Sequence, residues 1–115
     1  MSAVYSVESL KTVCPNASEM MEAGCRYVYL PQLKVNVGDQ VKVLDALMVL
    51  GEHSGYPTRL FLSALISERS SIRGQAANWT QHFILGRQWW SWSWTGVQSD
   101  LPWMQILLGH LEALR

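Results

Sequence analysis

This chain of 115 residues has no excess of charge, because nine lysines and arginines balance nine aspartates and glutamates. A nucleic-acid-binding surface needs surplus positive charge to neutralise phosphates, so we expect no nucleic-acid partner. No apolar run reaches the roughly 18 residues that a membrane span needs, so we expect no membrane partner. The first ten residues also lack the basic start and apolar stretch of a secretion signal, which predicts a cytoplasmic protein.

Cysteine and histidine are scarce as well. The two cysteines, Cys14 and Cys25, fit a reduced cytosolic protein with free thiols. The three histidines, His53, His82 and His110, are far apart in the sequence and at none of the spacings that zinc sites favour. We therefore expect neither a metal ion nor a cofactor.

What is abundant is apolar sequence. Hydrophobic residues make up 49% of the chain and charged residues 16%, which is typical of a chain that folds around its own core. No repeat, linker or low-complexity tract divides the sequence. We therefore expect one domain spanning residues 1–115.

Short-range sequence patterns predict helices, strands and loops for the chain before residue 98. Residues 6–13 can form a short helix capped by Ser6, and residues 16–24 a helical turn in which Asn16 and Glu19 form a capping box. Apolar and β-branched residues predict strands near 26–35, 43–51 and 59–66, with a turn at Gly38-Asp39. Polar residues predict an exposed loop over 67–78, and the signals over 79–98 are weak.

The last segment predicts a helix that begins at Asp100 as N-cap with Pro102 in its first turn. Its apolar residues recur at helical spacing on one face, and His110 falls on the polar side. The residues of that face are Leu101, Met104, Leu107, Leu108, Leu111 and Leu114. Together, the elements favour an α+β fold.

Two motifs resemble the ubiquitin-conjugating-enzyme superfamily: the strand-ending turn at Tyr56-Pro57, and the window WTQHFILGRQW at 79–89. The resemblance implies an N-terminal helix, a four-stranded antiparallel meander, a long crossover loop and a C-terminal helix packed on the sheet. Gly86 and Arg87 match the glycine and arginine of the family's active-site motif. Trp89 falls where that family has its catalytic cysteine.

Residues 27–35, 43–66 and 78–94 resemble, more narrowly, a small bacterial branch of this superfamily. Its members are encoded near ubiquitin-like proteins, activating-enzyme-like proteins and JAB-type peptidases. The resemblance therefore implies a ubiquitin-like protein and an activating-enzyme-like protein as partners, and a link to antiphage defence.

An indole cannot form a thioester, which needs a thiolate as nucleophile and leaving group. Cys14 and Cys25 lie before the first predicted strand, far along the chain from the crossover. We therefore expect a pseudo-enzyme that binds its partners without thioester chemistry. Indoles and charged side chains are typical interface anchors. The expected partner-binding residues are His82, Arg87, Trp89, Trp90 and Trp92.

Three alternatives stay open. A serine, Ser91 or Ser93, could form an oxyester, with His82 as base and Gln81 donating to an oxyanion. The tryptophans could instead stack on carbohydrate in an unrelated binding module. They could also pack inside the core, and alternation along WSWSW at 90–94 would then place the serines on the side opposite the indoles.

Overall fold

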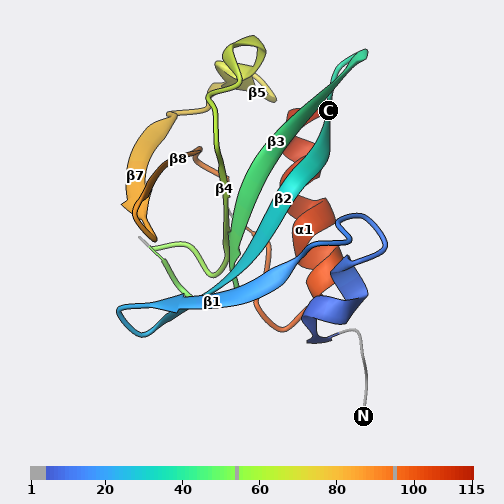
Figure 1. Ribbon diagram of the computed structural model, residues 1–115. Helices are drawn as coiled ribbons and strands as arrows, with labels where there is room; N and C mark the ends of the chain where they lie inside the picture. The colour runs from blue at the N-terminus through green and yellow to red at the C-terminus, as the bar shows by residue number, and fades with distance from the viewer. Residues whose placement is uncertain (1–4, 54, 95) are drawn as a thin grey trace.

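The computed structural model describes residues 5–53, 55–94 and 96–115. Most of it is one antiparallel sheet of six strands in the order β1-β2-β3-β4-β8-β7, with a single α-helix, α1 (Trp103–Leu111), packed against one side (Figure 1). The strands are β1 (Ser18–Glu22), β2 (Cys25–Val37), β3 (Gln40–Val49), β4 (Arg59–Leu62), β7 (Thr80–Ile84) and β8 (Arg87–Ser91). A small hairpin, β5 (Ser71–Ile72) and β6 (Gln75–Ala76), and three 3₁₀ helices, η2 (Val7–Leu10), η3 (Ser67–Arg69) and η4 (Glu112–Leu114), complete the described elements.

The chain is α+β, but the expected architecture of an N-terminal helix and a four-stranded meander is wrong. Instead of a helix over 6–13, the structure has the four-residue 3₁₀ helix η2, and Ser6 makes no side-chain cap. The sheet is larger than expected because the region 79–98 contains the β7–β8 hairpin. That hairpin joins the sheet through the pairing of Leu62 in β4 with Trp90 in β8.

The helical turn expected over 16–24 is also wrong, because this segment forms strand β1 and the turn after it. Glu19 lies opposite Val28 in the ladder with β2, and its carboxylate pairs with Arg26 at 2.8 Å instead of capping a helix. Ala23 and Gly24 have positive φ values of 51° and 79°. Two such residues form the tight turn whose twist matches a hairpin, so strand pairing overrides the local helix signal.

The same turn recurs in the segment 67–78, which we expected to be an exposed loop, and in the segment 79–98, where local signals are weak. Arg73 and Gly74 connect β5 to β6 with φ values of 51° and 80°, and Leu85 and Gly86 connect β7 to β8 with 54° and 74°. Glycine adopts this conformation without the steric cost that a Cβ brings. Gly86, which the resemblance assigned to an active-site motif, is therefore the second residue of a hairpin turn.

Helix α1 begins after Pro102, and no side chain caps it, so the predicted cap at Asp100 is wrong. Its buried residues are Trp103, Ile106, Leu107 and His110. Leu108, expected on the buried face, is 46% exposed. The helix is rotated from the expected orientation, and His110 is consequently a core residue.

A main core lies between α1 and the sheet, and we call it the helix-side core. Alternation along the strands sends Ala46 and Met48 of β3 into it, whereas Leu47 and Val49 point to the opposite face. That opposite face, which we call the helix-free face, has its own buried cluster. The cluster consists of Tyr27, Leu47, Val49, Phe61, Ile84 and Trp89.

The helix-free face is buried because the sheet bends over itself. Its two edge strands are β1 and β7. The carboxylate of Glu22, at the end of β1, accepts a hydrogen bond of 2.7 Å from the backbone N–H of Leu85, in the β7–β8 turn. This contact joins segments 63 residues apart and closes one corner of the curved sheet, so that Leu47 and Phe61 are fully buried with no helix over them.

Candidate functional site

The structure brings together three of the five expected partner-binding residues. Arg87 and Trp89 are two residues apart on β8, so their side chains point to the same face of the sheet. His82 of β7 lies opposite Trp89, and all three therefore belong to the helix-free face. Trp92 lies in the helix-side core instead. Trp90 is half-buried, pairs with Leu62 and points to the side of the sheet opposite Trp89.

Trp89 is an anchor inside the molecule. It is only 2% exposed, and its indole N–H donates to the carbonyl of Ile84 at 3.1 Å. Tyr29 approaches the ring edge-on with centroids 6.3 Å apart, and the Arg87 guanidinium lies over it at 4.7 Å. The indole is thus held from several sides.

A cavity of about 200 Å³ opens beside this indole, and we call it the corner cavity. It lies where the two ends of the curved sheet meet, and its walls come from β1, β2, β3, β8 and the β7–β8 turn. The lining residues are Met20, Tyr29, Leu47, Leu85, Arg87 and Trp89. Met20, which lines the cavity, is 37% exposed, whereas the Trp89 indole is almost fully buried. This apolar cavity with one cation at its side is the candidate site.

Asp45 holds Arg87 in place. The arginine forms an ion pair of 2.9 Å with Asp45, whose other oxygen accepts the backbone N–H of Gln32 at 2.9 Å. These contacts, first the Gln32 hydrogen bond and then Arg87, lower the pKa of Asp45, and the pKa of Arg87 is raised by the same carboxylate. Sequence reasoning missed Asp45, although a single acid within the apolar run 43–51 is a detectable signal.

A second cluster surrounds Phe61 on the same face. His53 and His82 each meet the phenyl ring edge-on, at 5.2 and 5.1 Å, and their own rings are 5.9 Å apart. Arg59, only 5% exposed, stacks over Tyr56 at 4.4 Å. Burial, and then the charge of Arg59, lowers the pKa of both imidazoles, which favours their neutral forms near pH 7.

Tyr56 and Pro57 lie in the turn between β3 and β4. The backbones of His53 and Tyr56 exchange two hydrogen bonds of 2.9 and 3.0 Å, which close the turn. Pro57 then precedes the buried Thr58 and strand β4. In this structure the motif orients Tyr56 under Arg59.

The structure argues against Ser91 as the nucleophile of the oxyester hypothesis. Ser91 is fully buried, its hydroxyl donates to the carbonyl of Leu60 at 2.9 Å, and it accepts from Arg59 Nε at 2.9 Å. The expected base, His82, is hydrogen-bonded through Nε2 to Thr80 at 2.9 Å. Ser93 is exposed, and its backbone N–H donates to the carbonyl of Ala77. The Ser91 hydroxyl, which accepts from Arg59, therefore holds the guanidinium of Arg59 in position.

The two thiols occupy different environments. Cys14 is 1% exposed, donates from Sγ to the carbonyl of Pro31 at 3.1 Å, and has a pKa raised by burial, so its thiolate is disfavoured. Cys25 is half-buried at the start of β2 and packs against the cluster of the helix-free face. No thiol lines the corner cavity.

None of the six tryptophans is fully exposed. Trp89, Trp92 and Trp103 are buried, and Trp79, Trp90 and Trp94 are half-buried. The N–H groups of Trp79 and Trp94 donate to carbonyls of the protein at 2.8 and 3.0 Å. Trp89, Trp92 and Trp103 are therefore withdrawn from any sugar-stacking surface, whereas Trp79, Trp90 and Trp94 keep part of their surface in solvent.

His110 is buried in the helix-side core, where the prediction of a polar, outward position is wrong. The Thr58 hydroxyl donates to the carbonyl of Val97 at 2.8 Å and lies 2.9 Å from His110 Nε2. Because the Thr58 hydroxyl proton is donated to Val97, the Thr58 oxygen accepts from Nε2, which therefore carries a proton. Burial, and then Arg59, lowers the pKa of His110 to about 4.

Within residues 5–53, 55–94 and 96–115, no three histidine, cysteine, aspartate or glutamate side chains converge as a metal site, and no helix is long and apolar enough to cross a membrane. Comparison with protein-family models, curated proteins and solved structures gives no match for this chain.

Proposed function

We propose that this chain is a non-catalytic binding component of a bacterial ubiquitin-like modification system. Its partner, a ubiquitin-like protein or an activating-enzyme-like protein, docks on the corner cavity. The observation that carries the proposal is the buried Trp89, which forms the wall of an apolar cavity and which the sequence resemblance aligns with the family's cysteine. The partner class rests on the resemblance alone, whereas the docking surface rests on the geometry.

The chemistry around the cavity favours binding over group transfer. An indole cannot carry an acyl group as a thioester, Ser91 is buried with its proton donated to a carbonyl, and Cys14 is buried. A protein used only for binding needs an apolar hollow with a few fixed polar groups, and the corner cavity has both.

The rim of the cavity supplies the contacts that a partner needs. Met20 on β1 is 37% exposed, and methionine adapts to irregular apolar surfaces. Arg87 is held by Asp45, so little side-chain entropy is lost when it meets a carboxylate or carbonyl of the partner. We expect a partner side chain of apolar type to enter beside Met20, next to Arg87.

The test uses the purified chain with the ubiquitin-like and activating-enzyme-like proteins encoded beside it, in the presence of ATP. We expect intact-mass measurements to find no hydroxylamine-sensitive adduct, and titration calorimetry to detect binding of one of the two proteins. The substitutions Met20→Glu and Arg87→Ala should each weaken that binding roughly tenfold or more.

Val41→Glu is the matched control, because Val41 is an exposed residue on β3 far from the cavity and should leave binding unchanged. An adduct abolished by Cys25→Ser or Ser91→Ala would show that the chain is catalytic. If neither protein bound, the proposed partner class would be wrong.

A further inference from the structure

Strand β2 has a free edge that no other described strand covers. Strand β1 pairs only with Cys25–Tyr29 of β2, whereas β3 pairs with β2 as far as Val37. In the described structure, residues 33–37 are therefore paired on one side only. Hydrogen-bonded and non-hydrogen-bonded pairs alternate along an antiparallel ladder, so every other residue of this stretch directs its N–H and C=O away from β3.

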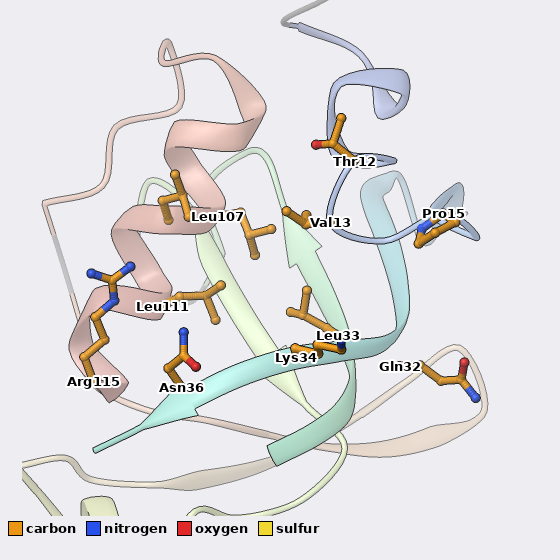
Figure 2. Close-up of a pocket in the computed structure, with 11 residues that line it drawn as sticks. Thr12, Val13, Pro15, Gln32, Leu33, Lys34, Asn36, Leu107, Leu111 and Arg115 are labelled. Carbon is orange, nitrogen blue, oxygen red and sulfur yellow. The ribbon is translucent and has the colours of Figure 1, made fainter. Parts of the chain in front are cut away.

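A groove of about 490 Å³ runs beside this free edge, and we call it the β2 groove (Figure 2). Helix α1 forms one wall with Leu107 and Leu111, and the segment before β1 forms another with Val13 and Pro15. Leu108 and Val13 are 46% and 44% exposed, so the walls present apolar surface to solvent. An extended strand beside a helix has both requirements for strand addition: unpaired backbone groups and an apolar groove for alternate side chains.

The charged side chains that line the groove are both cationic. Lys34 and Arg115 line it, and no aspartate or glutamate does. Among the nine lysines and arginines, all of which are described, five form ion pairs, and Arg59 and Arg69 donate side-chain hydrogen bonds. Lys34 and Arg115 are the two whose side chains have no ion-pair or hydrogen-bond partner in the described chain. The two unpaired cations thus lie at the same groove.

We propose that the β2 groove binds an extended peptide segment of a partner protein in which carboxylates alternate with apolar side chains. The segment adds as a strand to residues 33–37 of β2, and its apolar side chains contact Leu108 and Val13. Its carboxylates pair with Lys34 and Arg115. The period of two in a strand matches this arrangement, because it places one kind of side chain toward the groove and the other toward the cations.

The test uses a synthetic pool of short peptides with glutamate at alternate positions and a mixture of valine, leucine, isoleucine and phenylalanine between them. We expect amide resonances of residues 33–37 and of α1 to shift on titration. The outward N–H groups of β2 should also become roughly tenfold more protected from hydrogen exchange, because strand addition pairs them. A pool with lysine in place of glutamate should not bind.

Two changes separate strand addition from loose electrostatic contact. The double variant Lys34→Glu/Arg115→Glu should weaken binding roughly tenfold or more, whereas Arg26→Glu, an exposed cation of β2 in the part that β1 covers and outside the groove, should not. Backbone N-methylation of the peptides should weaken binding by a similar factor, since it removes the donors that pair with β2.

The proposal is overturned if the glutamate pool does not bind, in which case Lys34 serves only to protect the edge from aggregation. It is also overturned if the double variant or the N-methylated pool binds as well as the originals. Concentration-dependent dimerisation of the unliganded chain, measured by sedimentation and abolished by Lys34→Glu, would assign the groove to a second copy instead. Variants at the corner cavity, such as Met20→Glu, should leave peptide binding unchanged.

Discussion

The two faces of the sheet bury tryptophans in different ways. On the covered face, Trp92 packs with Trp79, whose ring is 5.1 Å away, and with residues of α1, and its own N–H is buried without a hydrogen-bond partner. On the helix-free face, Trp89 donates its N–H to the carbonyl of Ile84 and lies beneath Arg87. One indole is therefore held by ring and side-chain packing with its N–H unpaired, and the other by packing, a hydrogen bond and a cation.

The difference follows from what closes each face. A helix covers its face with a continuous apolar surface, so side chains there need only shape and volume to be stable. The helix-free face is closed by the bend of the sheet and by a few polar contacts, such as the one between Glu22 and Leu85. The ion pair between Asp45 and Arg87 also keeps a cation beside this apolar cluster, and the candidate site lies there.

The largest expected effect is at Trp92. Trp92→Ala should lower the free energy of unfolding by about 3–5 kcal/mol, because it leaves a cavity in the helix-side core. Trp92→Phe should cost less than about half as much, since no hydrogen bond of the indole N–H is lost. Chemical denaturation measures both. A Trp92→Phe variant as unstable as Trp92→Ala would show that the covered face depends on more than packing.

The next largest effect is on the pH dependence of the free energy of unfolding, and it comes from His110 on the covered face. The pKa of His110 falls from its ordinary 6.5 to about 4 in the folded chain, so folding favours the neutral imidazole. The stability from this group is present above pH 6.5 and is lost as the pH falls toward 4. The free energy of unfolding should therefore decrease by on the order of 3 kcal/mol over this range.

His110→Gln is the matched variant, because its amide nitrogen can still donate to Thr58 but does not titrate. Denaturation at several pH values should show a smaller decrease for this variant than for the native chain. Equal decreases would assign the effect to other groups, such as His53 and His82 on the helix-free face, whose pKa values are also lowered.

The smallest effect tests the polar contacts of the helix-free face. Ser91→Ala should cost about 1–3 kcal/mol of unfolding free energy, because it leaves Arg59 Nε and the Leu60 carbonyl without their buried partner. The exposed Ser93 is the control, and Ser93→Ala should change the free energy by less than about 0.5 kcal/mol. Equal effects of the two substitutions would remove the structural role assigned to Ser91.

Much of the element list was predictable from local patterns. The apolar runs near 26–35, 43–51 and 59–66 lie in β2, β3 and β4 or overlap them, and the final helix is present. The missed hairpins also carried a signal, because Ala23-Gly24, Arg73-Gly74 and Leu85-Gly86 are pairs ending in glycine that suit two-residue turns. The capping pattern at Asn16 and Glu19 predicted a helix because it depends only on neighbouring residues. The pairing of this segment with β2 lies outside such a local pattern and decided the outcome.

Less of the candidate site was predictable. Arg87, Trp89 and His82 were expected to be functional and do share a face, but Asp45 and Met20, which complete that site, come from strands far along the chain. Trp92 was expected beside them and lies in the other core. Successive strand residues point to opposite faces, and the strand alone does not reveal which face the helix will cover.

The sequence by itself determined that this chain folds as α+β, where its apolar strands lie, and that an apolar helix ends it, because these depend on periodicity and apolar content within short segments. Only the tertiary structure decided that the sheet has six strands, that it bends until Glu22 meets Leu85, and that His110 and Ser91 are buried. Those features depend on contacts between segments that are distant in sequence, and local propensity does not determine which of them form.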